Sequence, residues 1–126
     1  MITKAQKHAF QQDGFVVFPK LLAGDDLAEL DAMCDAVLDG KLAPVTPFEG
    51  WLPDHFYTFW EPGLQDRDDL PRRQRVRLMS NMCRHHPYFH AIVRHPRIVT
   101  ALQGLLDDDV MVRSDTIFMK PAHHGI

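Results

Sequence analysis

Histidine is the residue type in this sequence with the widest chemistry, because its imidazole binds transition metals and exchanges protons near neutral pH. The 126-residue chain contains 8 histidines. His86 and His90 stand four residues apart, the spacing that places two zinc ligands on one helical face in HExxH segments. The glutamate that acts as general base there is absent, and Pro87 follows the first histidine directly. Because a metal site needs further ligands, helix capping or a surface position is the favoured interpretation of both residues.

The remaining candidate ligands give the same result. His95 directly precedes Pro96, a position typical of a helix cap. His123 and His124 are adjacent, and neighbouring side chains of an extended backbone point to opposite sides, so both cannot easily reach one ion. The sequence therefore predicts no metal ligand. A small, unrelated His-rich metal-binding domain remains an alternative.

The sequence contains clear signals for the starts and ends of helices. Thr3 and Gln6 have the spacing of a capping box, and Gly14 suits the left-handed conformation that ends a helix. Asp26 and Glu29 have N-cap and N3 spacing ahead of an apolar face formed by Leu27, Leu30, Cys34, Val37 and Leu38, with Gly40 as the stop. Two more helices are expected to begin at Pro87 and Pro96, because proline fits the first helical position.

Two segments have the composition of strands. Residues 15–18, FVVF, form a short β-prone run that ends at Pro19. Residues 110–120 alternate well enough for a long strand, with Val110, Val112 and Thr116 on one face. Between the helices, residues 41–75 form a long proline-rich and aromatic excursion within the domain. Its large rings include Trp51, Phe56, Tyr57, Phe59 and Trp60.

Composition excludes several classes of protein. Charged residues make up 25% of the chain and the net charge is −3, without a basic stripe for nucleic acid or a basic amphipathic face for a membrane. No apolar run reaches membrane-spanning or signal-peptide length. Cys34 and Cys83 are expected to be reduced thiols. We expect a cytoplasmic protein with one domain over residues 1–126.

Three segments carry a family resemblance. They are FQQDGFVVFPKLL at 10–22, HPRIVTALQGLL at 95–106 and VMVRSDTIFMKP at 110–121. In this order they resemble the N-terminal part of the phytanoyl-CoA dioxygenase family of Fe(II)/2-oxoglutarate-dependent oxygenases. One departure is Asp107, which stands where the family often has glycine.

The resemblance implies an α+β fold in which an N-terminal helical region precedes the first strands of a double-stranded β-helix, or jelly roll. It implies hydroxylation of a small organic substrate coupled to decarboxylation of 2-oxoglutarate. The family holds Fe(II) with a His-x-Asp motif and a distal histidine, whereas this sequence ends PAHHGI after Lys120 and Pro121 and contains no His-x-Asp. We therefore expect a partial domain with an incomplete barrel, inactive and holding neither cofactor by itself.

The resemblance also assigns cosubstrate-binding roles to Arg77, Thr116 and Lys120. A guanidinium suits a carboxylate because it donates paired hydrogen bonds. The roles of Thr116 and Arg77 each have a plainer alternative, because threonine is common in strands and Arg77 ends a run of arginines typical of a solvated face.

The resemblance places Trp51, Phe56 and Trp60 in a loop that covers the substrate opening and shields the iron chemistry from water. The alternative is a loop anchored to the core by these aromatic rings. A different class of function is also open: the final strand is expected to expose an edge that binds a partner, or a second copy of the chain, by β-augmentation.

Overall fold

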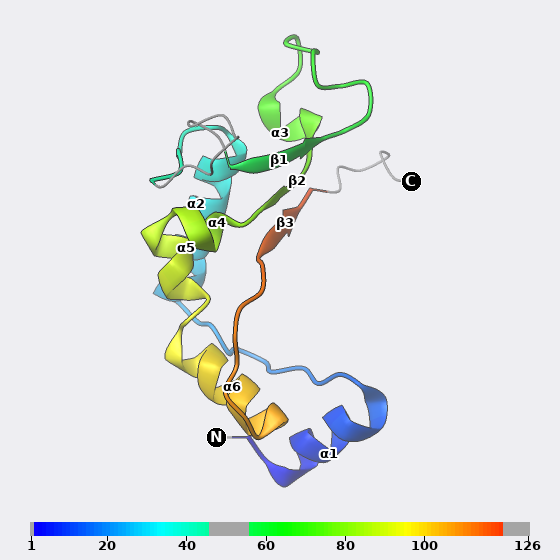
Figure 1. The fold of residues 1–126 in the computed structure, drawn as a ribbon, viewed down its shortest axis with the longest axis vertical. Coiled ribbons are helices and arrows are strands. Elements are labelled where there is room, and N and C mark those ends of the chain that lie inside the picture. Colours follow the sequence, from blue (N-terminus) through cyan, green and yellow to red (C-terminus); the bar gives the residue numbers. More distant parts are fainter. Residues whose placement is uncertain (1, 46–55, 120–126) are drawn as a thin grey trace.

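The computed structural model describes residues 2–45 and 56–119, in which some of the helices pack against a small antiparallel sheet and others lie at the far end of the molecule (Figure 1). The helices are α1 (Lys4–Asp13), α2 (Asp25–Leu38), α3 (Arg72–Arg75), α4 (Met82–His85), α5 (Pro87–Ile92) and α6 (Pro96–Leu106). The strands are β1 (Tyr57–Trp60), β2 (Val76–Ser80) and β3 (Thr116–Phe118), in the order β1-β2-β3. The predicted α+β class is confirmed at this level: a mixture of helices and an open three-stranded sheet.

The core lies between the sheet and the helices at one end of the molecule. Its buried residues come from α2, β2, α4, α5 and the residue before β1: Val37, Leu38, Phe56, Val76, Met79, Met82, Cys83 and Phe89. The other end holds α1 and α6, and the segments 14–24 and 107–115 run between the two ends (Figure 1). Most of the buried apolar side chains therefore lie at the end of the molecule that contains the sheet. Within the described residues, no helix is long and apolar enough to cross a membrane.

The predicted capping box at α1 is confirmed. Thr3 Oγ1 accepts a hydrogen bond from the Gln6 backbone N–H, and Gln6 Oε1 accepts one from the Thr3 backbone N–H. Gly14 follows the helix with φ +76°, and its N–H donates to the Phe10 carbonyl. Glycine has no Cβ to clash in this left-handed conformation, so the sequence marks both ends of α1.

The predicted start of α2 is wrong by two positions. Gly24 (φ +56°), not Asp26, is the N-cap, and it has no side chain to satisfy the free amides. Asp25 and Asp26 lie instead in the first turn, where negative charge is favourable near the positive end of the helix dipole. Leu27, expected on the buried face, is 54% exposed, whereas Val37 and Leu38 are buried.

The two proline-initiated helices form as predicted. His86 Nδ1 accepts a hydrogen bond from the Tyr88 N–H at 3.2 Å and caps α5. His95 Nδ1 accepts one from the Arg97 N–H at 3.2 Å and caps α6. The backbone N–H groups in the first turn of a helix have no carbonyl partner within the helix. Each imidazole therefore accepts a hydrogen bond from one of them, the N–H of the second helical residue.

The strand predictions are largely wrong. Residues 15–18 form no strand; Phe15 and Val17 are 66% and 70% exposed. Of the long strand predicted over residues 110–120, only Thr116–Phe118 forms one, and residues 110–115 are irregular. Strands β1 and β2 lie where the sequence suggested a loop and a solvated arginine run. The excursion over 41–75 thus contains β1 and α3, and its residues 46–55 lie outside the described residues.

Candidate functional site

The open face of the sheet gathers six side chains from all three strands. In the register of the sheet, Tyr57 pairs with Ser80 and Phe59 with Leu78, and these β2 residues pair in turn with Thr116 and Phe118. Paired residues share a face and alternate residues of a strand do too. Tyr57, Phe59, Leu78, Ser80, Thr116 and Phe118 therefore lie on one side of the sheet. We call this set the open sheet face.

The open sheet face combines exposed apolar rings with a pair of hydroxyls. Phe118 is 66% exposed, Phe59 43% and Tyr57 36%. The Tyr57 and Phe59 rings meet edge to face with centroids 4.5 Å apart. At the start of β3, Ser80 Oγ and Thr116 Oγ1 are 3.1 Å apart and share a hydrogen bond. Exposed phenylalanines on neighbouring strands form an apolar surface of the kind that proteins usually cover.

A β-bulge in β2 determines which of its residues point to the opposite face of the sheet. Trp60 pairs with Val76, and the register shifts between Phe59 and Trp60, so β2 carries one extra residue there. An extra residue changes the alternation locally. Val76 and Met79, three positions apart, are consequently both buried in the core at 0% and 1% exposure. One face of the sheet thus packs against the core through Val76 and Met79, while the other is open.

Arg77 lies at this bulge and is exposed. Its carbonyl accepts a hydrogen bond from the Met119 N–H at 2.9 Å, and its guanidinium has no acidic partner among residues 2–45 and 56–119. Thr116 pairs with Ser80, three residues farther along β2, or about 10 Å at the usual rise per strand residue. The two predicted cosubstrate residues are therefore on adjacent strands but not in contact.

The predicted aromatic loop residues lie in different surroundings. Phe56 is 3% exposed in the core, where its ring meets Phe89 edge to face at 6.4 Å. Trp60 is half-buried, and the guanidinium carbons of Arg72 and Arg75 lie 5.1 and 5.5 Å from its ring centroid. This placement is what the core-anchor alternative expects, and substrate contact stays a prediction. Trp51 and Lys120 lie outside the described residues.

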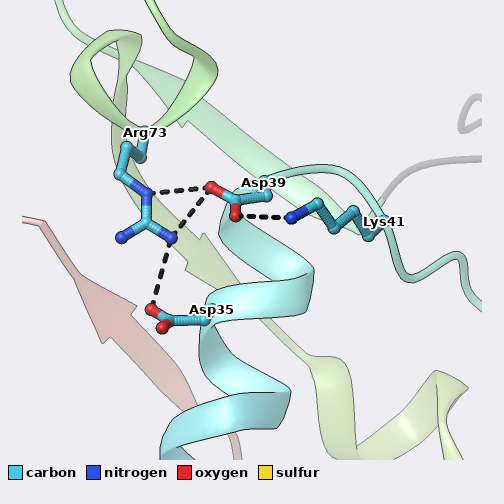
Figure 2. Close-up of polar contacts among 4 residues, drawn as sticks. All are labelled: Asp35, Asp39, Lys41 and Arg73. Atoms are coloured by element: carbon cyan, nitrogen blue, oxygen red, sulfur yellow. Dashed lines mark hydrogen bonds and ion pairs between the residues drawn. The ribbon is translucent and has the colours of Figure 1, made fainter.

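The arginine run is not the uniform solvated face that its composition suggested. Arg72 and Arg75 stack on Trp60, and Arg75 Nη1 also contacts Asp68 Oδ1 at 2.8 Å. Arg73 binds two carboxylates of the α2 end, as Figure 2 shows. Only Arg77 of the four keeps a guanidinium without a carboxylate or ring partner among the described residues.

Three histidines of the described residues make local contacts. His86 and His95 cap helices, and His90 Nε2 lies 3.0 Å from Arg94 Nη1. Burial lowers the pKa of His86, which favours the neutral imidazole that accepts the capping bond. Among residues 2–45 and 56–119, no group of three or more His, Cys, Asp or Glu side chains is arranged to hold a metal ion. His123 and His124 lie outside the described residues.

A buried thiol lies directly beside the start of β3. Asp115 Oδ1 accepts a hydrogen bond from the Cys83 N–H at 3.1 Å. Burial, reinforced by the hydrogen bond and the negative charge of Asp115, raises the pKa of the Cys83 thiol to about 11. Burial also raises the pKa of the Cys34 thiol, with Asp31 next in importance. Both cysteines are free thiols in the structure, as the sequence predicted.

No protein-family model, curated protein or solved structure matches the chain. The family resemblance therefore rests on the three sequence segments, and the candidate site rests on the geometry of the open sheet face.

Proposed function

We propose that the chain is the N-terminal part of a phytanoyl-CoA dioxygenase-like Fe(II)/2-oxoglutarate-dependent oxygenase, in which β1, β2 and β3 form part of the jelly-roll wall. The observation that carries this proposal is the asymmetry of the sheet. One face buries Val76 and Met79 under helices, and the other leaves Phe59 and Phe118 exposed. A jelly roll covers such a face with a second sheet about 10 Å away, so the open sheet face has the character of an unfinished barrel interior.

The conformation at the end of α6 is compatible with the resemblance. The sequence departs from the family pattern at Asp107, where glycine is common. Asp107 has φ +57° and ψ +26° and ends α6 in the left-handed conformation. Glycine adopts this conformation without strain, and aspartate is one of the few other residues that tolerate it. The glycine that the family often has at this position would therefore fit the backbone of this chain.

The open sheet face and the β2 bulge beside it carry groups suited to a dicarboxylate cosubstrate. Thr116 supplies a hydroxyl at the start of β3, and Arg77 supplies a guanidinium without an internal carboxylate among the described residues. A guanidinium binds a carboxylate through paired, charge-assisted hydrogen bonds. We assign to Arg77 and Thr116 a contribution to 2-oxoglutarate binding that further side chains complete, and Lys120 remains a predicted third member.

Unlike 2-oxoglutarate, iron has no suitable ligand set among the described residues of this chain. The sequence contains no His-x-Asp, and the described residues bring no three ligating side chains together. The proposal therefore assigns no iron ligand here. In the intact oxygenase this chain would shape the pocket and hold the cosubstrate, while the metal chemistry depends on ligands from outside it.

The nucleotide sequence that follows codon 126 tests the proposal directly. We expect it to encode a His-x-Asp motif about a dozen codons after Pro121, in frame or in a shifted frame. Sequence without this motif in any forward frame would contradict the proposal. The measurement needs no protein and is independent of the stability of the chain.

A binding measurement on the 126-residue chain provides the second test. Calorimetric titration with Fe(II) and 2-oxoglutarate under anaerobic conditions is expected to show no stoichiometric iron site, and an aerobic assay is expected to yield no succinate. Succinate formation that depends on added iron would overturn the assignment of the ligands to residues outside the chain. Protein without a histidine tag is required, because a tag itself binds iron.

A further inference from the structure

A second surface feature lies away from the open sheet face. A groove with a volume of about 1040 Å³ runs between α5, α6 and the irregular segment 109–114. Its apolar lining comes mainly from Val93, Val99 and Leu102, on the helix side, and Val110 and Val112, on the other. Leu102 is 39% exposed and Val112 44%, so the apolar lining is accessible to a ligand.

The rim of the groove is basic. Arg84, Arg94 and Arg113 line it together with His90, and Asp109 is the acidic residue among the lining side chains. None of the three arginines forms an ion pair within residues 2–45 and 56–119. The chain as a whole has a net charge of −3. Three unneutralised guanidinium groups around one groove therefore make it locally complementary to negative charge.

The segment along the groove also has free backbone groups. No backbone–backbone hydrogen bond within the described residues involves residues 110–114. The Arg113 carbonyl accepts a side-chain hydrogen bond from Arg84 Nη2 at 3.3 Å. The β-prone alternation of this segment made it part of the predicted strand, yet it pairs with no strand of the described chain. A partner in extended conformation would supply the missing ladder.

We propose that this groove binds an extended acidic peptide whose residues alternate between acidic and apolar. The peptide pairs through its backbone with residues 110–114. Alternate side chains of a strand point to opposite sides, so its apolar residues contact Val93, Val99 and Leu102 while its carboxylates meet the arginines of the rim. The proposal does not depend on the oxygenase assignment, because it uses neither the open sheet face nor Arg77.

The dimensions favour a peptide over a small metabolite. Small-molecule sites typically measure about 300–1,000 Å³ and enclose most of the ligand surface. This groove is at the upper limit of that range and partly open to solvent, with Met111 at its edge 93% exposed. An extended chain is held along its length by repeated backbone bonds and does not need enclosure.

Fluorescence anisotropy with a defined probe tests the proposal. The probe is a fluorescein-labelled heptapeptide, Glu-Val-Glu-Val-Glu-Val-Glu, titrated with the full 126-residue chain. We expect saturable binding that weakens as sodium chloride is raised, and no binding of the matched peptide with lysine in place of glutamate. Equal binding of both peptides would overturn the proposal and indicate nonspecific binding. Displacement of the probe by millimolar inorganic phosphate would overturn it and indicate a simple anion site.

Charge-reversal variants test whether the peptide binds in this groove. Arg94→Glu and Arg113→Glu are each expected to weaken probe binding severalfold, and the double variant on the order of tenfold or more. Lys4→Glu changes the net charge as much as either single variant but lies in α1, outside the groove lining. It is expected to bind the probe like the unaltered chain. Equal weakening by Lys4→Glu would show that only net charge matters and would overturn the site.

Proline substitution tests the backbone pairing. Consecutive amides of an extended chain point in opposite directions, so Met111→Pro and Val112→Pro remove donors from opposite edges. One variant is expected to lose probe binding and the other to retain it, while Met111→Ala and Val112→Ala both retain it. Circular dichroism serves to show that each variant remains folded. Retained binding by both proline variants would overturn strand pairing. If the free chain sediments as a dimer and either proline variant sediments as a monomer, the groove would be assigned to a second copy of the chain instead of an acidic peptide.

Discussion

Arg73 Nε donates a hydrogen bond to Asp39 Oδ1 at 2.8 Å across 34 residues of sequence. The same guanidinium reaches Asp35 Oδ1 at 3.3 Å, and Lys41 Nζ donates to Asp39 Oδ2 at 3.2 Å (Figure 2). The cluster joins α3, which precedes β2, to the C-terminal end of α2. Hydrogen bonds from Arg73 first and Lys41 second lower the pKa of Asp39.

This lowered pKa predicts a pH-dependent contribution to stability. A carboxyl whose pKa is depressed in the folded state stabilises the fold above its unfolded pKa of about 3.9, and the contribution is lost as the pH falls through the folded value. We expect Asp39→Asn to lower the melting temperature at pH 7 relative to the unaltered chain. The difference should shrink as the pH falls below about 4. Thermal melts followed by circular dichroism between pH 3 and pH 7 measure it.

Asp69 provides a matched control for this prediction. Its pKa is also lowered, chiefly by a hydrogen bond from Arg67, two residues away. Because so local a pair also forms in the unfolded chain, it adds little to the difference between the two states. Asp69→Asn should therefore leave the melting temperature nearly unchanged across the same pH range. Similar pH profiles for both variants would contradict a role for the Arg73–Asp39 contact.

The two faces of β1 predict opposite results for two neighbouring aromatic residues. Trp60→Ala removes a half-buried ring on which Arg72 and Arg75 stack at 5.1 and 5.5 Å. We expect it to lower the free energy of unfolding by about 2–3 kcal/mol, below the usual cost for a fully buried tryptophan. Phe59→Ala acts on the open sheet face and should cost about 1 kcal/mol or less. Urea denaturation of both variants measures the difference.

Self-association distinguishes the same two variants. Phe59 is 43% exposed beside Tyr57, so its removal reduces the exposed apolar area and should lower any concentration-dependent association in analytical ultracentrifugation. Trp60→Ala should not have this effect. A large loss of stability from Phe59→Ala would show that the open sheet face is covered in solution, and would remove the observation on which the proposed function rests.

The parts of the fold that follow from local signals were predictable from the sequence. The Thr3–Gln6 capping box, Gly14 and the two His-Pro helix starts each depend on residues that contact one another within a few positions. Such contacts are encoded by spacing alone. The start of α2 was misplaced because Asp26 and Glu29 imitate a capping box, whereas the backbone turns at Gly24.

The sheet was not predictable in the same way, because its strands are short and defined by their partners. Residues 76–80, VRLMS, alternate only after the bulge at Arg77, and their register depends on residues nearly 20 and 40 positions distant. The alternation in residues 57–60, YTFW, was a signal that could have indicated a strand. Conversely, residues 110–114 have strand composition but no backbone partner among the described residues, and pairing outweighs propensity. The open sheet face was therefore missed although Thr116 on it was singled out.

The conformation of Asp107 predicts that glycine is the better residue there. Left-handed backbone costs a non-glycine residue about 1–2 kcal/mol, less for aspartate, and Asp107 has φ +57°. We expect Asp107→Gly to raise the free energy of unfolding by about 0.5–1 kcal/mol. The variant also loses the exposed ion pair with Lys7, worth at most a few tenths of a kcal/mol. Urea denaturation measures the net gain.

Two further variants separate the backbone effect from the ion pair. Asp107→Ala keeps a Cβ and loses the carboxylate, so it should be less stable than the unaltered chain. In a Lys7→Gln background the ion pair is already absent, and the gain from Asp107→Gly should be slightly larger. A loss of stability in Asp107→Gly would mean that the helix end is held by the carboxylate and not limited by backbone strain.

The Cys83 thiol is predicted to be chemically inert in the folded protein. With its pKa raised to about 11, the thiolate fraction at pH 8 falls on the order of a hundredfold below that of an ordinary cysteine of pKa about 8.5. The side chain is also only 7% exposed. Iodoacetamide at pH 8 should therefore leave Cys83 unmodified in the native chain and modify it fully in urea, as peptide mass spectrometry can show.

Asp115→Asn tests the cause of this inertness. Burial is the largest cause of the raised pKa and Asp115 contributes a hydrogen bond and a negative charge. Removing the charge should lower the pKa of Cys83 but leave it above the ordinary value, so alkylation at pH 8 should become faster and stay slower than in urea. The asparagine oxygen still accepts the bond from the Cys83 N–H, which preserves the turn before β3. Alkylation as fast as in urea would show that the variant has opened the core, and an unchanged rate would show that burial alone protects the thiol.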